Sequence, residues 1–201
     1  MGDQMKVRWI LASASPRRRE ILEQIGIEPE VRQSHLEEKA DSADPAEVVR
    51  QLSLQKAADI AAQPDLQTCG APMIVLGADT VVAAGGKILG KPRDHGEAAD
   101  MIRLLQGSTH RVLTGVTMIF LRPGKPAETV AFTEQTEVDV APMSEAEITA
   151  YADSPEPMDK AGAYAIQGGF AAYVMRIRGS YSNVVGLPAA QVYETARKFS
   201  W

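Results

Sequence analysis

Three consecutive arginines, Arg17–Arg19, follow a Ser-Pro step where an apolar run, residues 6–13, gives way to helical spacing. The unpaired N–H groups at a helix start carry partial positive charge, so exposed cations there are unfavourable by roughly 0.3–1 kcal/mol each. A bound anion removes this conflict. The hydroxyls of Ser13 and Ser15, the helix N–H groups and the guanidinium groups can together bind a polyphosphate. The pattern predicts a phosphate site, and the alternative is a capped helix whose arginines pair with surface acids.

The same stretch predicts where one of these arginines points. Arg18 falls on the apolar stripe of its helix with Leu22 and Ile25, so we expect its side chain to face inward. The glycine signatures of the P-loop and of the dinucleotide-binding fingerprint are both absent from the chain. Any phosphate site here is therefore of another kind.

A carboxylate interrupts one of the most apolar stretches of the chain. Asp79 lies within "MIVLGADTVV", where a charge is costly unless it is paired or bound to a metal. The alternative is an aspartate at a strand end, bonded to backbone amides.

Lys56 lies on a helical stripe with apolar residues, and spacing alone favours a lysine that snorkels from the edge of the core.

Four further charged residues stand near turns or in loops. Lys91 precedes a proline after a predicted strand, Lys160 opens a glycine-rich stretch, and Glu37 and Glu38 lie in a polar loop. Each can be an ordinary solvated side chain. Together with Asp79 they supply cations for phosphates and carboxylates for a divalent metal, the groups that phosphoryl hydrolysis requires.

The composition is that of an ordinary globular protein. The chain has 201 residues, of which 45% are hydrophobic and 23% charged, and its net charge of −5 does not favour a broad nucleic-acid surface. Cys69 is the only cysteine and the three histidines lack zinc-ligand spacing, which predicts no disulfide within the chain and no zinc site. No stretch approaches the ~20 apolar residues of a membrane span. We expect a cytoplasmic protein.

Capping and turn signals predict alternating strands and helices. A strand over residues 6–13 leads to a helix capped by Ser15 and ended by Gly26, and a second helix starts at Asp44, with Glu47 completing a capping box. The remaining expected features are a hairpin turning at Gly85-Gly86, a helix over 96–107, strands around Pro123-Gly124, a capping box at Ser144 and Glu147, a strand over 172–179, a loop over 180–188 and a final helix to Phe199. The class is α/β, with a mixed twisted sheet flanked by helices.

Six blocks of the sequence resemble those of a known family. "SASPRRREIL", "GADTVV", "GKPRD", "HRVLTGV", "DKAGAYAIQG" and "GSYSNVVGLP" occur in the order found in the Maf family of nucleoside triphosphate pyrophosphatases. The resemblance runs from about Ile10 to Tyr193, so residues 1–201 are read as a single Maf-like domain. It implies two lobes around a nucleotide-binding cleft, and cleavage between the α and β phosphates with Mg²⁺ or Mn²⁺ as cofactor.

The resemblance also assigns roles to residues. The family's general base falls on Asp79, and its acidic metal-holding residue falls on Glu38, so that Glu38 and Asp79 bind the metal. The positions expected to hold phosphates are Ser13, Ser15, Arg17, Arg18, Lys56, Lys91 and Lys160.

Three positions match the family members that act on dTTP and UTP. These are Arg17, Thr80 and Gln167, and the Gln167 amide offers the donor and the acceptor that suit the edge of a uracil or thymine. The alternatives are a nucleotide-binding regulator of cell division without turnover, and a pyrophosphatase for modified purine nucleotides such as 7-methyl-GTP. We expect a small-molecule nucleotide substrate, no nucleic-acid polymer, no membrane partner and a homodimer.

Overall fold

The computed structural model describes residues 7–68 and 70–199 and shows two compact units. The first unit runs to Asp79 and includes Gly115–Thr133 and the chain from Gly186, and the second comprises Thr80–Thr114 and Glu134–Val185. Cys69 lies outside the described residues. Within the described ranges, no helix is long and apolar enough to cross a membrane.

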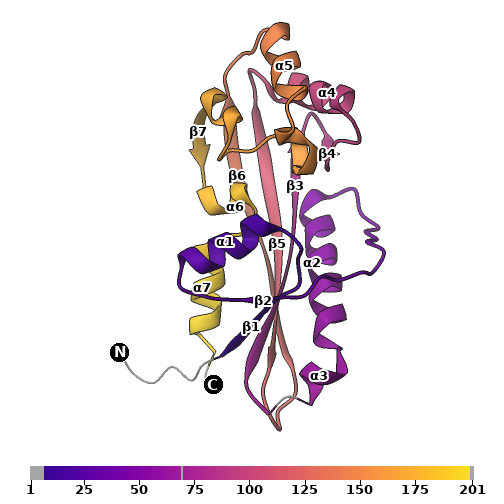
Figure 1. Ribbon diagram of the computed structural model, residues 1–201, viewed down its shortest axis with the longest axis vertical. Coiled ribbons are helices and arrows are strands. Elements are labelled where there is room, and N and C mark those ends of the chain that lie inside the picture. The colour runs from indigo at the N-terminus through magenta and orange to yellow at the C-terminus, as the bar shows by residue number, and fades with distance from the viewer. Residues whose placement is uncertain (1–6, 69, 200–201) are drawn as a thin grey trace. The chain divides into compact units, whose positions relative to one another are not determined.

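The described strands form a seven-stranded mixed sheet, as the sequence predicted (Figure 1). The strand order is β2-β1-β3-β5-β6-β7, and β4 pairs with β3. The strands are β1 (Arg8–Leu11), β2 (Glu30–Val31), β3 (Met73–Ala84), β4 (Lys87–Leu89), β5 (Thr109–Leu121), β6 (Glu128–Val140) and β7 (Val174–Arg178). The helices are α1 (Pro16–Gln24), α2 (Pro45–Ala61), α3 (Pro64–Gln67), α4 (His95–Leu105), α5 (Glu145–Ala152), α6 (Tyr181–Val185) and α7 (Ala189–Arg197), with 3-10 turns η1 (Glu156–Asp159), η2 (Ala161–Ala163) and η3 (Gly169–Tyr173).

In the first unit, helices cover both faces of the strands. Successive residues of a strand point to opposite faces. Ile119 of β5 accordingly joins the buried cluster with Ala57 and Ile60 of α2, whereas Phe120 stacks on Phe199, just beyond α7, with ring centroids 3.4 Å apart. β1 pairs in parallel with both β2 and β3. Figure 1 shows α2 and α7 on opposite sides of these strands.

Two glycines let α2 lie directly against strand backbone. A Cβ on Gly77 of β3 would collide with the carbonyl oxygen of Ser53 and lie 2.7 Å from the Ala57 nitrogen. A Cβ on Gly115 of β5 would collide with α2 in the same way, 2.8 Å from the Arg50 nitrogen. Side chains at either glycine would push the helix outward, so these two positions set how close α2 comes to β3 and β5.

The second unit contains the predicted hairpin, and α4 and α5 pack on each other in it. β3 and β4 pair antiparallel around Gly85 and Gly86, whose φ angles of +55° and +74° favour glycine. Asn183 is fully buried and donates to the Val112 carbonyl at 3.1 Å and to Thr136 Oγ1 at 3.0 Å. Its amide therefore joins α6 to β5 and β6.

Ser15 is at the N-cap of α1 as predicted, and two other local predictions were wrong: the capping box at the start of α2 and the loop over 180–188. Ser15 stands at the N-cap of α1 without a side-chain capping bond, and its N–H donates to Ser13 Oγ at 3.2 Å. Asp44 caps α2 through the Ala46 N–H, while Glu47 binds side chains further along the helix, so no capping box forms. The expected loop over 180–188 contains α6. The capping box at the start of α5 is confirmed.

Candidate active site

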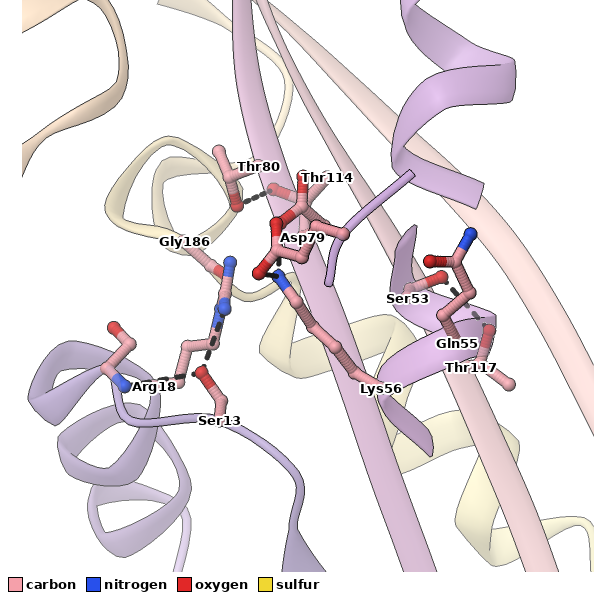
Figure 2. A network of polar contacts seen from close by, with 12 residues as sticks. Ser13, Arg18, Ser53, Gln55, Lys56, Asp79, Thr80, Thr114, Thr117 and Gly186 are labelled. Carbon is pink, nitrogen blue, oxygen red and sulfur yellow. Dashed lines mark hydrogen bonds and ion pairs between the residues drawn. The ribbon is translucent and has the colours of Figure 1, made fainter. Parts of the chain in front are cut away.

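The charged centre of the first unit is an ammonium group between two carboxylates. Lys56 Nζ lies 2.6 Å from Asp79 Oδ1 (Figure 2). The same Nζ lies 3.0 Å from Glu38 Oε1. The Lys56 and Asp79 side chains are each 14% exposed, whereas that of Glu38 is 54% exposed. The preference for a snorkelling lysine was therefore wrong, because Lys56 is directed at Asp79 in the interior of β3. Asp79 is paired rather than capped by amides.

The packing of α2 explains how Lys56 reaches the strand. The turn of α2 that approaches Gly77, between Ser53 and Ala57, is the turn that carries Lys56. On the same helix, the hydroxyl of buried Ser53 bonds with that of Thr117 on β5 at 3.0 Å (Figure 2). This buried hydrogen bond and the glycine contacts hold α2, so the direction of Lys56 follows from backbone packing and not from its own contacts alone.

Arg18 points inward, as its place on the helical stripe predicted. Its Nε donates to the Gly186 carbonyl at 2.9 Å and its Nη1 donates to Ser13 Oγ at 2.9 Å (Figure 2). Burial lowers the pKa of Arg18, and the negative charges of Asp79 and Glu38 act in the opposite direction. The buried guanidinium thus lies within the electrostatic reach of both carboxylates.

The three arginines at the helix start have different environments. Arg18 is buried, Arg17 is half-buried, and Arg19 forms a surface ion pair with Glu23 at 3.0 Å. The alternative of a simple surface ion pair therefore holds for Arg19. The first unit brings together Ser13, Arg18, Glu38, Lys56 and Asp79, with Ser15 and Arg17 adjacent in the chain.

The other predicted site residues belong to the second unit. Thr80 follows Asp79 along β3, and its hydroxyl bonds with that of Thr114 at 2.9 Å. Lys160 is largely buried, donates to the Glu156 carbonyl at 3.2 Å and pairs with Asp159.

Two exposed side chains complete this set. Lys91 follows β4 and lines an open groove between that strand and α4, and Gln167 lies in the turn between η2 and η3. The Gly162 N–H donates to the Gly90 carbonyl at 3.0 Å, so the backbone next to Lys91 bonds to the segment that follows Lys160.

Several supporting residues were missed by the sequence analysis. The Gly186 carbonyl orients Arg18, Thr114 bonds Thr80, and the Glu156 carboxylate accepts hydrogen bonds from the backbone after Gln167. A backbone carbonyl has no signal in sequence. In the sequence, Thr114 is marked only as a polar residue in an apolar run. Glu156 is marked only as an acidic residue between two prolines.

The fold and this charged centre define an α/β protein with paired carboxylates and directed cations, a combination suited to phosphate chemistry. The chain belongs to the Maf family: the Maf-like protein family matches residues 8–199. The dTTP/UTP pyrophosphatase of Lachnoclostridium phytofermentans is 47% identical over 190 residues, covering 94% of each chain. That of Bacillus pumilus is 46% identical over 191 residues, covering 94% of this chain and 95% of that one. A HAM1 protein structure from Coxiella burnetii aligns with a TM-score of 0.46 and 12% identity over 95% of this chain and 98% of that chain.

Proposed function

We propose that the protein is a nucleoside triphosphate pyrophosphatase that hydrolyses dTTP and UTP. The products are the nucleoside monophosphate and pyrophosphate. Membership of the Maf family and relatives named dTTP/UTP pyrophosphatase at 43–47% identity support this proposal. The observation that carries it is the ammonium of Lys56 between Asp79 and Glu38, with buried Arg18 close enough for its pKa to respond to both carboxylates.

In this proposal the residues of the first unit act on the phosphates. A water molecule attacks the α-phosphorus, the bond to the β-phosphate breaks, and pyrophosphate leaves. Asp79 accepts the proton of the attacking water as general base. Arg17, Arg18 and Lys56 offset the charge of the triphosphate and of the leaving group, while Ser13 and Ser15 donate hydrogen bonds to phosphate oxygens.

The acidic pair also fits a divalent cation. Carboxylate oxygens completed by substrate phosphates are the ligands that Mg²⁺ usually takes in nucleotide enzymes. Glu38 and Asp79 both reach one cationic group, although the described residues contain no cluster of three or more His, Cys, Asp or Glu side chains that could hold a metal. We propose that these two residues hold Mg²⁺ or Mn²⁺ together with the nucleotide. The bound ion would supply positive charge for the triphosphate.

The predicted residues of the second unit have the remaining roles toward the nucleotide in this proposal. Lys91 and Lys160 bind phosphates, and Thr80 and Gln167, together with Arg17, select the pyrimidine. A net charge of −5 supports a small nucleotide over a nucleic-acid polymer. We further propose a cytoplasmic homodimer without a membrane partner; the single cysteine is in keeping with a reducing compartment.

The test is pyrophosphate release from UTP, dTTP, CTP and 7-methyl-GTP with Mn²⁺, for the wild-type protein and Asp79→Asn. We expect turnover of UTP and dTTP in the wild type and loss of turnover in the variant. Preference for 7-methyl-GTP would indicate a modified-purine enzyme. Tight nucleotide binding without any release would instead indicate a regulator.

A further inference from the structure

A single carboxylate accepts two backbone N–H groups that lie two and three residues after Gln167. Glu156 Oε2 accepts the N–H of Gly169 at 2.9 Å, and Oε1 accepts that of Phe170 at 3.4 Å. The hydroxyl of Tyr151 donates to the same Oε1 at 2.7 Å. Glu156 therefore joins α5 to the chain segment immediately after the predicted base-reading residue.

Tyr151 holds the other side of that segment. The N–H of Ala165 donates to the Tyr151 hydroxyl at 3.2 Å, and the Tyr151 and Phe170 rings are 5.2 Å apart. Gln167 is thus bracketed by backbone bonds two residues before it and two residues after it. The Tyr151 hydroxyl accepts the first of these bonds and the Glu156 carboxylate accepts the second. We call this pair of restraints the Glu156 bracket.

A glycine next to Gln167 makes room for this carboxylate. A Cβ on Gly168 would lie 2.5 Å from Glu156 Oε1, closer than atoms of a real side chain can approach. The contact explains the glycine in "IQGG" by the approach of an acid and not by a left-handed turn.

At neutral pH, Glu156 and Tyr151 have the protonation states that their hydrogen bond requires. Burial raises the pKa of Glu156, but the N–H of Gly169 and the Tyr151 hydroxyl outweigh it and hold that pKa below its usual value. Burial raises the pKa of Tyr151 above its usual value. Glu156 is therefore an ionised acceptor, and Tyr151 is a protonated donor.

We propose that Glu156, with Tyr151, is a positioning residue for base selection: it fixes the backbone that presents the Gln167 amide to the base. This inference rests on the proposed function and adds to it a determinant of uracil and thymine specificity. An exposed glutamine in an unrestrained glycine-rich turn would lose conformational freedom on binding, and the bracket removes that cost beforehand. Its effect should fall on recognition of the base and not on the chemistry at the phosphates.

The test compares Glu156→Gln with the wild type, using UTP and CTP. The amide of the substituted side chain keeps one acceptor oxygen. Its NH₂ group is a donor and would face the N–H of Gly169 or the Tyr151 hydroxyl, which are donors as well. The backbone carbonyl that accepts the Lys160 ammonium is unchanged. We expect the UTP-to-CTP ratio of kcat/KM to fall by about tenfold through a higher KM for UTP, with kcat unchanged. Glu145→Gln, an exposed acid of the same unit paired with Arg103, is the control and should alter neither value.

Two further variants separate positioning from a merely structural role. Tyr151→Phe keeps the ring, removes both hydroxyl bonds and should lower the same ratio. Gln167→Ala should abolish the discrimination, and adding Glu156→Gln to it should have no additional effect on the ratio. An unchanged ratio in both Glu156→Gln and Tyr151→Phe, or an equal fall in kcat for both nucleotides, would overturn the inference.

A binding measurement distinguishes this inference from the proposed function. Calorimetry with UMP and CMP reports base selection without turnover. If no nucleotide is hydrolysed, the proposed function fails, yet a loss of UMP preference in Glu156→Gln would still support the positioning role. If hydrolysis occurs and the preference for UMP survives in Glu156→Gln, the inference fails alone.

Discussion

Acidification should destabilise the protein through one buried histidine before its carboxylates titrate. His110 on β5 is 1% exposed, and its Nε2 lies 2.8 Å from the Tyr164 hydroxyl. Its Nδ1 has no hydrogen-bond partner among the described residues. Burial lowers the pKa of His110 to about 4, despite the opposing charge of Asp139. The folded protein therefore holds this ring neutral.

The size of the effect follows from proton linkage. The unfolded chain binds a proton near the ordinary histidine pKa of 6.5, whereas the folded chain resists it until about pH 4. Stability from the neutral ring is thus fully present above pH 6.5 and is lost as the pH falls through this interval. Between pH 7 and pH 5 the loss is about 2 kcal/mol. Carboxylates with lowered pKa values, such as Glu156, act in the same direction but mainly below pH 5.

Urea unfolding at pH 7, 6 and 5 measures this loss. His110→Gln removes the titrating ring, so its free energy of unfolding should change less with pH than that of the wild type. His35→Gln, at an exposed histidine, is the matched control and should keep the wild-type slope. Equal slopes in the wild type and His110→Gln between pH 7 and 5 would refute the reasoning.

Three further predictions concern the charged centre. Asp79→Asn should reduce pyrophosphate release by about 10² to 10⁴-fold while thermal unfolding stays close to that of the wild type; release at the wild-type rate would exclude it as the base. Gly77→Ala should cost about 1–3 kcal/mol in urea unfolding, because its Cβ meets the α2 backbone, whereas Gly90→Ala, which has open space, should not. The Lys56→Met variant should bind Mn²⁺ more tightly than the wild type in the absence of nucleotide, because the two carboxylates lose their ammonium partner. Electron paramagnetic resonance measures this affinity, and an unchanged affinity would count against a metal site at these carboxylates.

Local signals in the sequence determined most of the elements. Ser144 and Glu147 form the predicted capping box, and strands meet at the predicted glycine turns. Such signals are readable because caps and turns involve residues within a few positions of each other. The burial of Arg18 also followed from its helical stripe, and the cost of a charge at Asp79 followed from its apolar neighbours.

The tertiary structure decided which groups meet. The stripe on α2 showed which face Lys56 occupies but could not show that Asp79, 23 positions away, lies opposite it. Likewise, the Gly186 carbonyl lies 168 positions from the arginine that it orients, and the Glu156 bracket depends on how η1 packs against η3. The spacing of residues along the sequence indicates which of them are neighbours within one helix or strand. Pairing between elements depends on how closely their backbones approach, which here is set by contacts at glycines such as Gly77.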